Sequence, residues 1–269
     1  MKRIREQEEA IERRMARVKY KIAVISGKGG VGKSFISANL SVTLATTGRH
    51  VGVLDVDFHG PSIPKLLGLQ GRRMINTSSG LLPIIGPEGV KVVSIDFMLP
   101  SEETPVIWRG PLKTNVLREL LSIVEWSDLD YLIVDLPPGT GDEPLSIAQL
   151  IKGLTGAIVV TIPSDLSRIV VKRAISFAKQ LNIELLGVIE NMSYFVCPKC
   201  GSIYKIFGEG AGERIAKEMK VNFLGKIPLD PRASECMDEG EPVITCCPES
   251  EVAKAILKVT ETVIRIVER

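Results

Sequence analysis

The chain has 269 residues, of which 45% are hydrophobic and 25% are charged, and its formal net charge is +2 at pH 7. A chain of this length buries roughly three quarters of its unfolded surface, which is enough for one large domain without disulfides. The small net charge gives no electrostatic sign of nucleic-acid binding, for which a strong basic excess is expected. Five cysteines, an odd number, do not resemble a secreted disulfide framework and favour the cytoplasm.

The first 19 residues are rich in charge and precede the first strand-like run. They lack the apolar core of a signal peptide, and they carry four glutamates, whereas transit peptides are poor in acids. We predict a solvated, partly helical arm over residues 1–19, with docking to a partner protein as the alternative. No apolar run reaches the ~18 residues that span a bilayer.

From residue 20 onward, short β-branched runs alternate with longer segments of helical apolar spacing. The runs are nearly continuous in apolar residues, as expected for strands covered on both faces. We predict strands over 21–26, 51–56, 90–95, 131–136, 157–162, 184–189 and 222–227. We predict helices over 33–47, 111–124, 168–181, 209–219 and 250–268. This alternation predicts one α/β domain over 20–269, with a mostly parallel twisted sheet, helices on both faces and a loose excursion over 68–89.

The segment GKGGVGKS, residues 27–34, follows the first predicted strand and opens a helix. It fits the P-loop pattern G-x-x-x-x-G-K-[ST] in the context that the pattern requires, which predicts a P-loop NTPase. The glycines let backbone N–H groups point at phosphate oxygens, and the helix N-terminus adds partial positive charge. Lys33 is expected to reach the β- and γ-phosphates, and Ser34 to bind Mg²⁺. The predicted nucleotide-binding residues here are Gly27, Lys28, Gly29, Gly30, Val31, Gly32, Lys33 and Ser34.

Three aspartates end two of the predicted strands. Asp55 and Asp57 lie at the end of the second strand, and Asp135 ends the strand over 131–136. Parallel strands present these ends at the sheet edge where open α/β sheets bind ligands, so we expect the three carboxylates near the phosphate loop. The alternative for each of them is a capping role in the turn that follows its strand.

Lys28, directly after the first glycine, makes the loop resemble the deviant Walker A motif of the family that contains MinD, ParA and the nitrogenase iron protein. The resemblance implies a homodimer in which Lys28 contacts the partner's bound phosphates, like an arginine finger supplied in trans. It also implies that Asp135 holds Mg²⁺ or its water shell, that Asp57 orients the attacking water, and that Asp55 supports the magnesium shell.

The same resemblance implies two contacts to the base of ATP. Asn191, at the end of a predicted strand, would hydrogen-bond the purine edge, although an asparagine there is usually a turn residue. The segment over 226–232, with Pro228, would cover the opposite side of the adenine.

Further segments resemble the Mrp/ApbC branch of this family, whose members are iron–sulfur cluster carriers or scaffolds. They are DFHGPSIPKLLGL (57–69), WRGP (108–111), DLPPGTGDEPLS (135–146), NMSYFVCPKCG (191–201), IFGEGAGERIA (206–216) and IPLDPRASECMDEGEPV (227–243). The resemblance implies an ATPase that loads or transfers a cluster to apo iron–sulfur proteins in the cytoplasm.

Cys197 and Cys200 form a C-x-x-C in a predicted metal-site insertion around 191–204. This spacing lets two thiolates face one metal or cluster, but two thiolates are half of a ligand set. A symmetric homodimer supplies four, which suits a [4Fe–4S] cluster, and the resemblance implies this arrangement. A bridging zinc ion and a structural or redox pair stay as alternatives. Packing in the interior is expected for the other cysteines, Cys236, Cys246 and Cys247.

A rival function is a MinD-like spatial regulator that cycles on a membrane. Its support would be the segment over 251–269, whose helical apolar spacing is compatible with an amphipathic membrane helix. We expect the apolar face of this helix to close the outer layer of the sheet instead, without stable membrane association. That face comprises Val252, Ile256, Val259, Val263 and Ile266.

Overall fold

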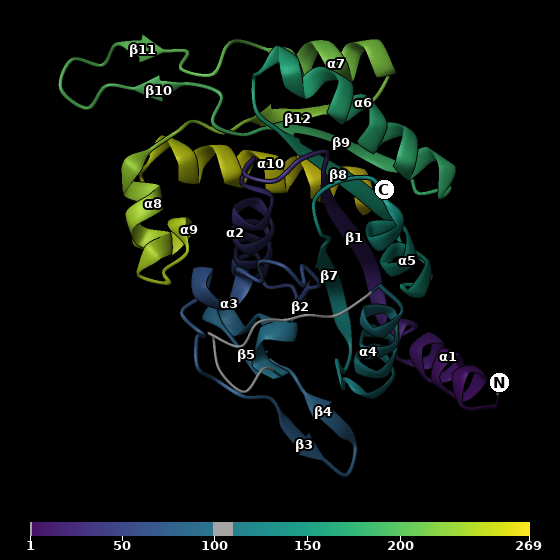
Figure 1. Cartoon of the computed structure of the whole chain (residues 1–269). Helices are drawn as coiled ribbons and strands as arrows, with labels where there is room; N and C mark the ends of the chain where they lie inside the picture. Colours follow the sequence, from purple (N-terminus) through teal and green to yellow (C-terminus); the bar gives the residue numbers. More distant parts are fainter. Residues whose placement is uncertain (1, 99–109) are drawn as a thin grey trace.

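The computed structural model describes residues 2–98 and 110–269, and an eight-stranded sheet forms its centre (Figure 1). Seven strands are parallel, and β5 at one edge pairs antiparallel to β6. In sheet order the strands are β12 (Phe223–Lys226), β9 (Leu185–Glu190), β8 (Gly156–Thr161), β1 (Val18–Ser26), β7 (Leu129–Asp135), β2 (Val51–Asp55), β6 (Lys91–Ser94) and β5 (Ile84–Ile85). The predicted mostly parallel sheet is confirmed, and each predicted strand overlaps one of the seven parallel strands.

Helices cover both faces of the sheet, and each face has its own apolar core (Figure 1). On β1, Ile22 and Val24 join one core and Ala23 and Ile25 join the other, because successive side chains of a strand point to opposite faces. The first core is covered by α2 (Lys33–Thr46), α3 (Ile63–Leu66), α8 (Pro231–Asp238), α9 (Val243–Cys246) and α10 (Glu251–Val267). The second is covered by α1 (Lys2–Met15), α4 (Gly110–Ile123), α5 (Asp142–Leu150), α6 (Asp165–Gln180) and α7 (Ala211–Met219).

Two short hairpins project from the body of the molecule (Figure 1). One pairs β3 (Ile75–Thr77) with β4 (Gly80–Leu82) inside the predicted excursion over 68–89. The other pairs β10 (Phe195–Val196) with β11 (Ile203–Tyr204) around the C-x-x-C. Short 3₁₀ turns, η1 (Pro87–Gly89) and η2 (Ile95–Met98), flank β6. Strands of two or three residues are too short to give a periodic pattern, so the sequence did not predict them.

The amino-terminal segment forms a packed helix rather than a solvated arm. Ile11 and Met15 of α1, one turn apart, are each 2% exposed and belong to the second core. Arg14 donates hydrogen bonds to the carbonyl oxygens of Ser122 and Val124 and forms an ion pair with Glu125 at 2.7 Å. The predicted helix is confirmed, but the prediction that it is solvated is wrong. Only two apolar residues of the helix reach the core, and the many charged residues around them favoured a solvated segment.

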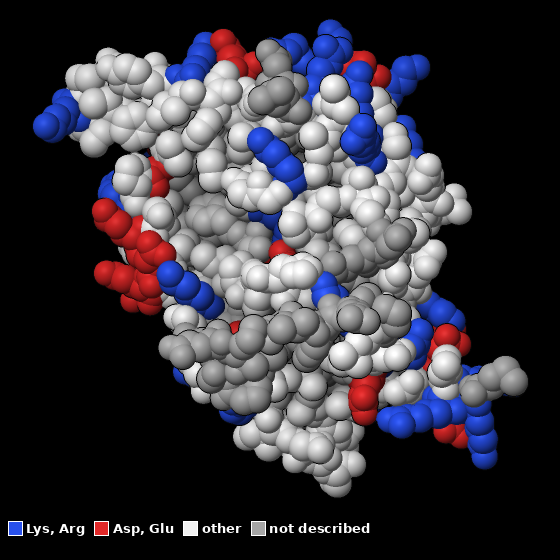
Figure 2. Space-filling view, viewed as in Figure 1, with Lys and Arg blue, Asp and Glu red and all other residues white. Residues whose placement is uncertain are grey.

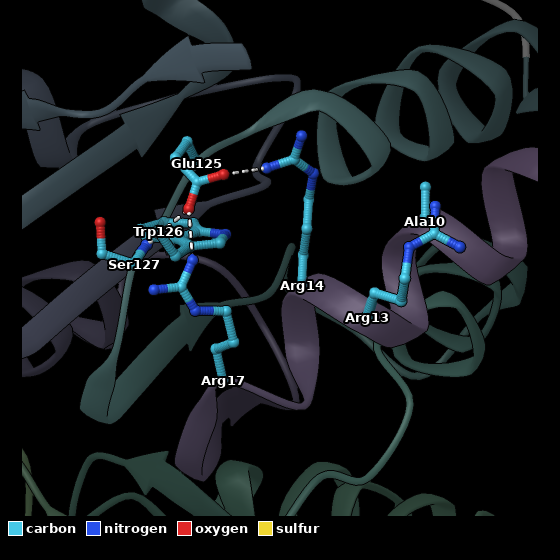
Figure 3. A pocket seen from close by; sticks show the side chains of 7 residues that line it. All are labelled: Ala10, Arg13, Arg14, Arg17, Glu125, Trp126 and Ser127. Carbon is cyan, nitrogen blue, oxygen red and sulfur yellow. Dashed lines mark hydrogen bonds and ion pairs between the residues drawn. The ribbon is translucent and has the colours of Figure 1, made fainter. Parts of the chain in front are cut away.

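A small polar pocket marks the junction between α1 and the body of the protein. The guanidinium groups of Arg14 and Arg17 converge on the carboxylate of Glu125, beside the buried ring of Trp126 (Figure 3). These contacts tie α1 to the segment between α4 and β7. The strand β1 begins at Val18, so it also includes the last residues of the predicted arm.

We expect Ile11→Ala to lower the free energy of unfolding by about 2–5 kcal/mol, because it removes buried methyl and methylene groups from a packed site. The matched control is Ile4→Ala on the same helix, where the side chain is 47% exposed and the change should be small. Urea unfolding of both variants measures the difference. Equal stability of the two variants would show that α1 does not contribute to the folded core.

The carboxy-terminal helix α10 buries its apolar face in the first core. Val252, Ile256, Val259 and Val263 are at most 4% exposed, and Ile266 is partly buried against the same core. The expectation that this face closes the outer layer of the sheet is therefore confirmed. Across residues 2–98 and 110–269, every helix is too short or too polar to cross a membrane.

The cysteines of α8 and α9 differ from the expectation of simple packing. Cys236 and Cys246 form a disulfide bond with a Cα–Cα distance of 6.0 Å, and Cys247 lies beside it as a free thiol. Only Cys236 is fully buried. The expected interior packing is confirmed for Cys236, but the disulfide was not expected, because the fold brings Cys236 of α8 against Cys246, ten residues further along the chain.

Charged side chains of both signs lie on the face shown in Figure 2, and some of the lysine and arginine side chains lie near its middle. This mixture fits the small net charge of the chain. That the protein does not bind nucleic acid stays a prediction from composition.

Candidate functional site

The loop over residues 27–34 joins β1 to α2 and borders a cavity of about 350 Å³. Part of the opposite wall comes from the segment after β2, including Asp57, Gly60 and Ser62. The predicted site residues that line the cavity are Gly29, Gly30, Val31, Gly32, Lys33, Ser34 and Asp57. The structure therefore brings the phosphate loop and one of the three aspartates to a common hollow.

Two glycines of the loop have backbone conformations that favour glycine. Gly30 and Gly32 have φ angles of 76° and 81°, in the left-handed region that other residues rarely adopt. Gly32 is also crowded, because an added Cβ would lie 2.1 Å from Nδ2 of Asn191. Gly27 is needed for a different reason: its Cβ would lie 2.6 Å from the carbonyl oxygen of Val170 on α6. These contacts fix the path of the loop.

Asp135, at the end of β7, is the centre of a buried polar network. Its Oδ2 lies 2.7 Å from Nζ of Lys33 and accepts a hydrogen bond from Ser34 at 2.6 Å. Its Oδ1 accepts a hydrogen bond from Ser37 at 2.6 Å. Asp135 and Lys33 are 0% and 6% exposed, so the ammonium group compensates a carboxylate that is cut off from water.

Ser37 was not predicted as a site residue. It lies three residues after Ser34 on α2, so both hydroxyls occupy neighbouring positions on the helix and face the same carboxylate. The spacing of the two serines was visible in the sequence, but the phosphate-loop pattern ends at Ser34. Together, hydroxyl and carboxylate oxygens form the hard donor set that Mg²⁺ prefers.

Asp55 is completely buried behind this network and lies opposite Asp135 in the register of β2 and β7. It accepts hydrogen bonds from the hydroxyl of Ser94 at 3.1 Å and from the backbone N–H of Asp57 and Ile63. Burial, and then the charge of Asp135, raise the pKa of Asp55 to about 8. Asp55 does not line the cavity, and its supporting role at the magnesium shell stays a prediction.

We expect the nucleotide-free, magnesium-free protein to lose stability as the pH rises from 3.8, the unfolded pKa of Asp55, to about 8, its folded pKa. In this window the folded state holds a proton that the unfolded state has released, so the free energy of unfolding falls with rising pH. The variant Asp55→Asn lacks this carboxyl group, so its stability should depend less on pH. Across the window, its free energy of unfolding should change less than that of the unaltered protein, by on the order of a few kcal/mol. Urea midpoints at about pH 5 and about pH 8 measure the effect. Identical pH dependence in both proteins would contradict it.

Asp57 lies at the edge of the cavity and is 8% exposed. Its Oδ1 accepts hydrogen bonds from the backbone N–H groups of His59 and Gly60, at 3.2 and 3.3 Å. These bonds hold the carboxylate across from the phosphate loop. Lys28, by contrast, is exposed and is not among the residues that line the cavity.

The two predicted adenine contacts lie in different places. Asn191 is 3% exposed, and its Nδ2 donates a 2.9 Å hydrogen bond to the carbonyl oxygen of Val31, so it braces the phosphate loop. Pro228 lines a separate cavity of about 230 Å³, which it shares with Phe195 and Pro198 of the C-x-x-C segment. The purine-edge role of Asn191 and the adenine contact of Pro228 stay predictions.

The C-x-x-C sits at the tip of the β10–β11 hairpin, outside the body of the protein (Figure 1). The N–H of Cys197 donates a hydrogen bond to the carbonyl oxygen of Ser202, and the N–H of Gly201 donates one to the carbonyl oxygen of Cys197. Both distances are 2.9 Å. Cys197 is half-buried and Cys200 is exposed, and both are free thiols. The tip therefore presents two thiols on a hydrogen-bonded turn.

Two further features of the hairpin bear on metal binding. Hydrogen bonding with Ser202, and then with Cys197, lowers the pKa of the Cys200 thiol and so favours the thiolate that binds metals. Next to the thiols, a group of exposed apolar side chains forms a patch, here called the hairpin patch. It comprises Ile203, Tyr204, Ile206 and Phe207, which are 42–63% exposed.

Comparison with known families decides the class of the protein. A family model described as a NUBPL iron-transfer P-loop NTPase of the ParA group matches residues 17–264. The chain belongs to this family. The resemblance read from the sequence is thereby confirmed, and the phosphate loop over 27–34 is the P-loop of a NUBPL-type NTPase.

Two curated relatives of this NUBPL-type NTPase share one name. A protein of Saccharolobus solfataricus is 54% identical over 96% of this chain and 87% of its own length, and it is called an iron-sulfur cluster carrier protein. A protein of Methanocaldococcus jannaschii with the same name is 48% identical over 100% of this chain and 91% of its own length.

Solved structures agree on the fold of the NUBPL-type NTPase. A nucleotide-binding protein of Archaeoglobus fulgidus, solved with ADP and containing cobalt, has a TM-score of 0.80 and 41% identity, with 91% of this chain and 94% of that chain covered. The cell division ATPase MinD of Pyrococcus furiosus has a TM-score of 0.70 and 25% identity, with 91% and 98% covered. The predicted α/β P-loop fold is confirmed.

Proposed function

We propose that the protein binds and hydrolyses ATP, holds a [4Fe–4S] cluster across a homodimer, and passes the cluster to apo iron–sulfur proteins in the cytoplasm. The observation that carries this proposal is the pair Cys197 and Cys200 at the tip of a projecting hairpin, on a protein that also has a P-loop. The names of the relatives at 48–54% identity support the same function.

The network around Asp135 supports ATP and Mg²⁺ as ligands. The ammonium group of Lys33 now compensates the negative charge of Asp135. A phosphate group in the cavity would compete with Asp135 for this ammonium group. Asp135 and the hydroxyl of Ser34 would then be available to a cation, and this donor set fits Mg²⁺. When bound, Mg²⁺ neutralises charge on the phosphates during transfer.

Hydrolysis needs a positioned water molecule and compensation of the charge that develops on the phosphates. Asp57 is held across the cavity from the loop by two backbone N–H groups, which suits a group that orients water. The buried Asp55 accepts a hydrogen bond from Ser94 and so holds the ends of β2 and β6 together. It would support the magnesium shell from a distance. Lys28 is exposed, which suits a residue that acts on the partner's nucleotide.

The hairpin supports a shared cluster as cargo. One tip offers two thiols, and a two-fold axis through the hairpins of two copies would bring four thiolates together, the usual ligand set of a [4Fe–4S] cluster. The exposed hairpin patch supports the same arrangement, because apolar surface of this kind is typical of protein contacts. A nucleotide can shift the protein between two states only if it binds these states with different affinity. For ATP to control the cargo, the stability of the bound cluster must therefore differ between the nucleotide states of the protein.

A transfer assay tests the proposal. The protein is loaded with iron and sulfide under anaerobic conditions and mixed with an apo-acceptor that requires a four-iron cluster, with and without ATP. We expect recovery of acceptor activity and a change in its rate when ATP is replaced by a non-hydrolysable analogue. No transfer under any nucleotide condition would refute the carrier function, whereas transfer without a nucleotide effect would refute only the coupling.

The membrane-cycling alternative has less support. Its candidate membrane helix, α10, has its apolar face in the first core and would have to leave the fold in order to insert. Liposome flotation in the presence of ATP distinguishes the two functions. We expect the protein to stay with the unbound fraction, and flotation with the liposomes would restore the alternative.

A further inference from the structure

Three cysteines outside the hairpin lie together where α8 meets α9. Cys236 of α8 is bonded to Cys246 at the end of α9, and Sγ of Cys247 lies 3.7 Å from Sγ of Cys236. All three Sγ atoms lie within 4.8 Å of one another. Cys236 is 4% exposed, and Cys246 and Cys247 are half-buried, so the cluster has one open side.

The backbone explains how two adjacent cysteines converge on the third. On a regular helix, neighbouring side chains point about 100° apart and do not share a ligand easily. Here α9 ends at Cys246, and Cys247 leaves the helix with φ −140° and ψ 67°. The change in backbone conformation between the two residues turns both sulfur atoms toward Cys236.

The support for this cluster is rigid. The N–H groups of Cys246 and Cys247 donate to the carbonyl oxygens of Pro242 and Val243, at 2.9 and 3.0 Å. The N–H of Val243 in turn donates to Oδ1 of the buried Asn39 on α2, at 2.9 Å. The turn that carries both cysteines is therefore hydrogen-bonded to the core, which is what a site with fixed ligands requires.

The spacing suits a metal ion. Zinc–sulfur bonds of about 2.3 Å in a tetrahedral site place ligand sulfurs about 3.8 Å apart. The observed distance between Cys236 and Cys247 is 3.7 Å. Once the disulfide is reduced, Cys246 can move to a similar distance by rotation of its side chain. Thiolates select soft metal ions, and three of them leave a fourth position open for water or another ligand.

We propose that Cys236, Cys246 and Cys247, in their reduced form, bind one thiophilic metal ion such as Zn²⁺, and that the Cys236–Cys246 disulfide closes this site. A dithiol reductant opens it: the reductant gives two electrons and two protons to the disulfide and becomes a disulfide itself. The metal ion then displaces the protons of the thiols. This site lies apart from the C-x-x-C hairpin and is independent of the proposed function.

Zinc retention tests the site in a protein that lacks Cys197 and Cys200, so that the hairpin contributes no ligand. This Cys197→Ala/Cys200→Ala background is reduced anaerobically with a phosphine, which does not bind zinc strongly, given Zn²⁺ and desalted. We expect about one zinc per chain in the reduced protein and little in the oxidised protein. A reduced protein without zinc, or equal zinc in both redox states, would overturn the proposal.

The variant Cys247→Ser in the same background keeps the two bonded cysteines but loses one ligand. Its zinc affinity should fall at least about tenfold, while its nucleotide affinity, measured as a check on folding, stays the same. Unchanged zinc affinity would exclude Cys247 from the site and contradict the proposal.

A second measurement needs no variant at this site. Alkylation of Cys247 in the reduced background, followed by mass spectrometry of its peptide, should slow at least about tenfold when zinc is present. An equal alkylation rate with and without zinc would mean that no metal is held by this thiol.

Discussion

The variant Lys28→Ala is expected to lower the ATP turnover number by about 10³-fold or more, the size of effect seen when a cation supplied in trans is removed. ATP binding should be nearly unchanged, because Lys28 is exposed and does not line the cavity of its own chain, whereas Lys33 does. The reason is that Lys28 would compensate charge on the nucleotide of the partner, and only while that charge develops.

Two controls separate this role from a general loss of charge. Lys33→Ala should abolish ATP binding itself, since it removes the ammonium group that lies inside the cavity. Lys258→Ala, an exposed lysine on α10, should change neither binding nor turnover. Single-turnover hydrolysis and ATP titration measure both quantities. Normal turnover in Lys28→Ala would rule out its action across a dimer.

The double variant Cys197→Ala/Cys200→Ala is expected to retain at least about tenfold less iron and sulfide after anaerobic reconstitution. Its ATP binding should stay normal, because the hairpin contributes no residue to the cavity beside the phosphate loop. The absorbance of the reconstituted protein and a chemical iron count measure the effect.

A matched control removes two other cysteines, Cys236→Ser/Cys246→Ser. This variant loses the same number of cysteines, here the two of the disulfide, but keeps the hairpin, so its four-iron cluster should form as in the unaltered protein. If the hairpin variant held its iron as well as this control, the cluster would have to bind elsewhere.

The sheet and the phosphate loop could be predicted because their signals are local. The apolar runs of strands such as β7 and β8 and the glycines of the loop lie within short stretches of chain. The meeting of Asp55 and Asp135 followed from a general rule about parallel strand ends. The register of β2 and β7 makes the two residues direct neighbours. This register could not be predicted from either strand alone.

Features that depend on distant contacts could not be predicted in this way. The burial of Ile11 depends on α4, which lies about a hundred residues away in the chain, so the charges around it favoured a solvated arm. The Cys236–Cys246 disulfide joins two short helices whose packing has no sequence signal. The position of Ser37 on the helix could be predicted, but its hydrogen bond to Asp135 depends on where the fold places that carboxylate.

Native mass spectrometry of freshly reconstituted, anaerobic protein determines whether two copies of this protein share one cluster. We expect a dimer whose mass exceeds that of two chains by one [4Fe–4S] unit, with two thiolates from each copy. Single chains that each hold their own metal, or a dimer bridged by zinc alone after iron reconstitution, would show that the two copies do not share an iron–sulfur cluster.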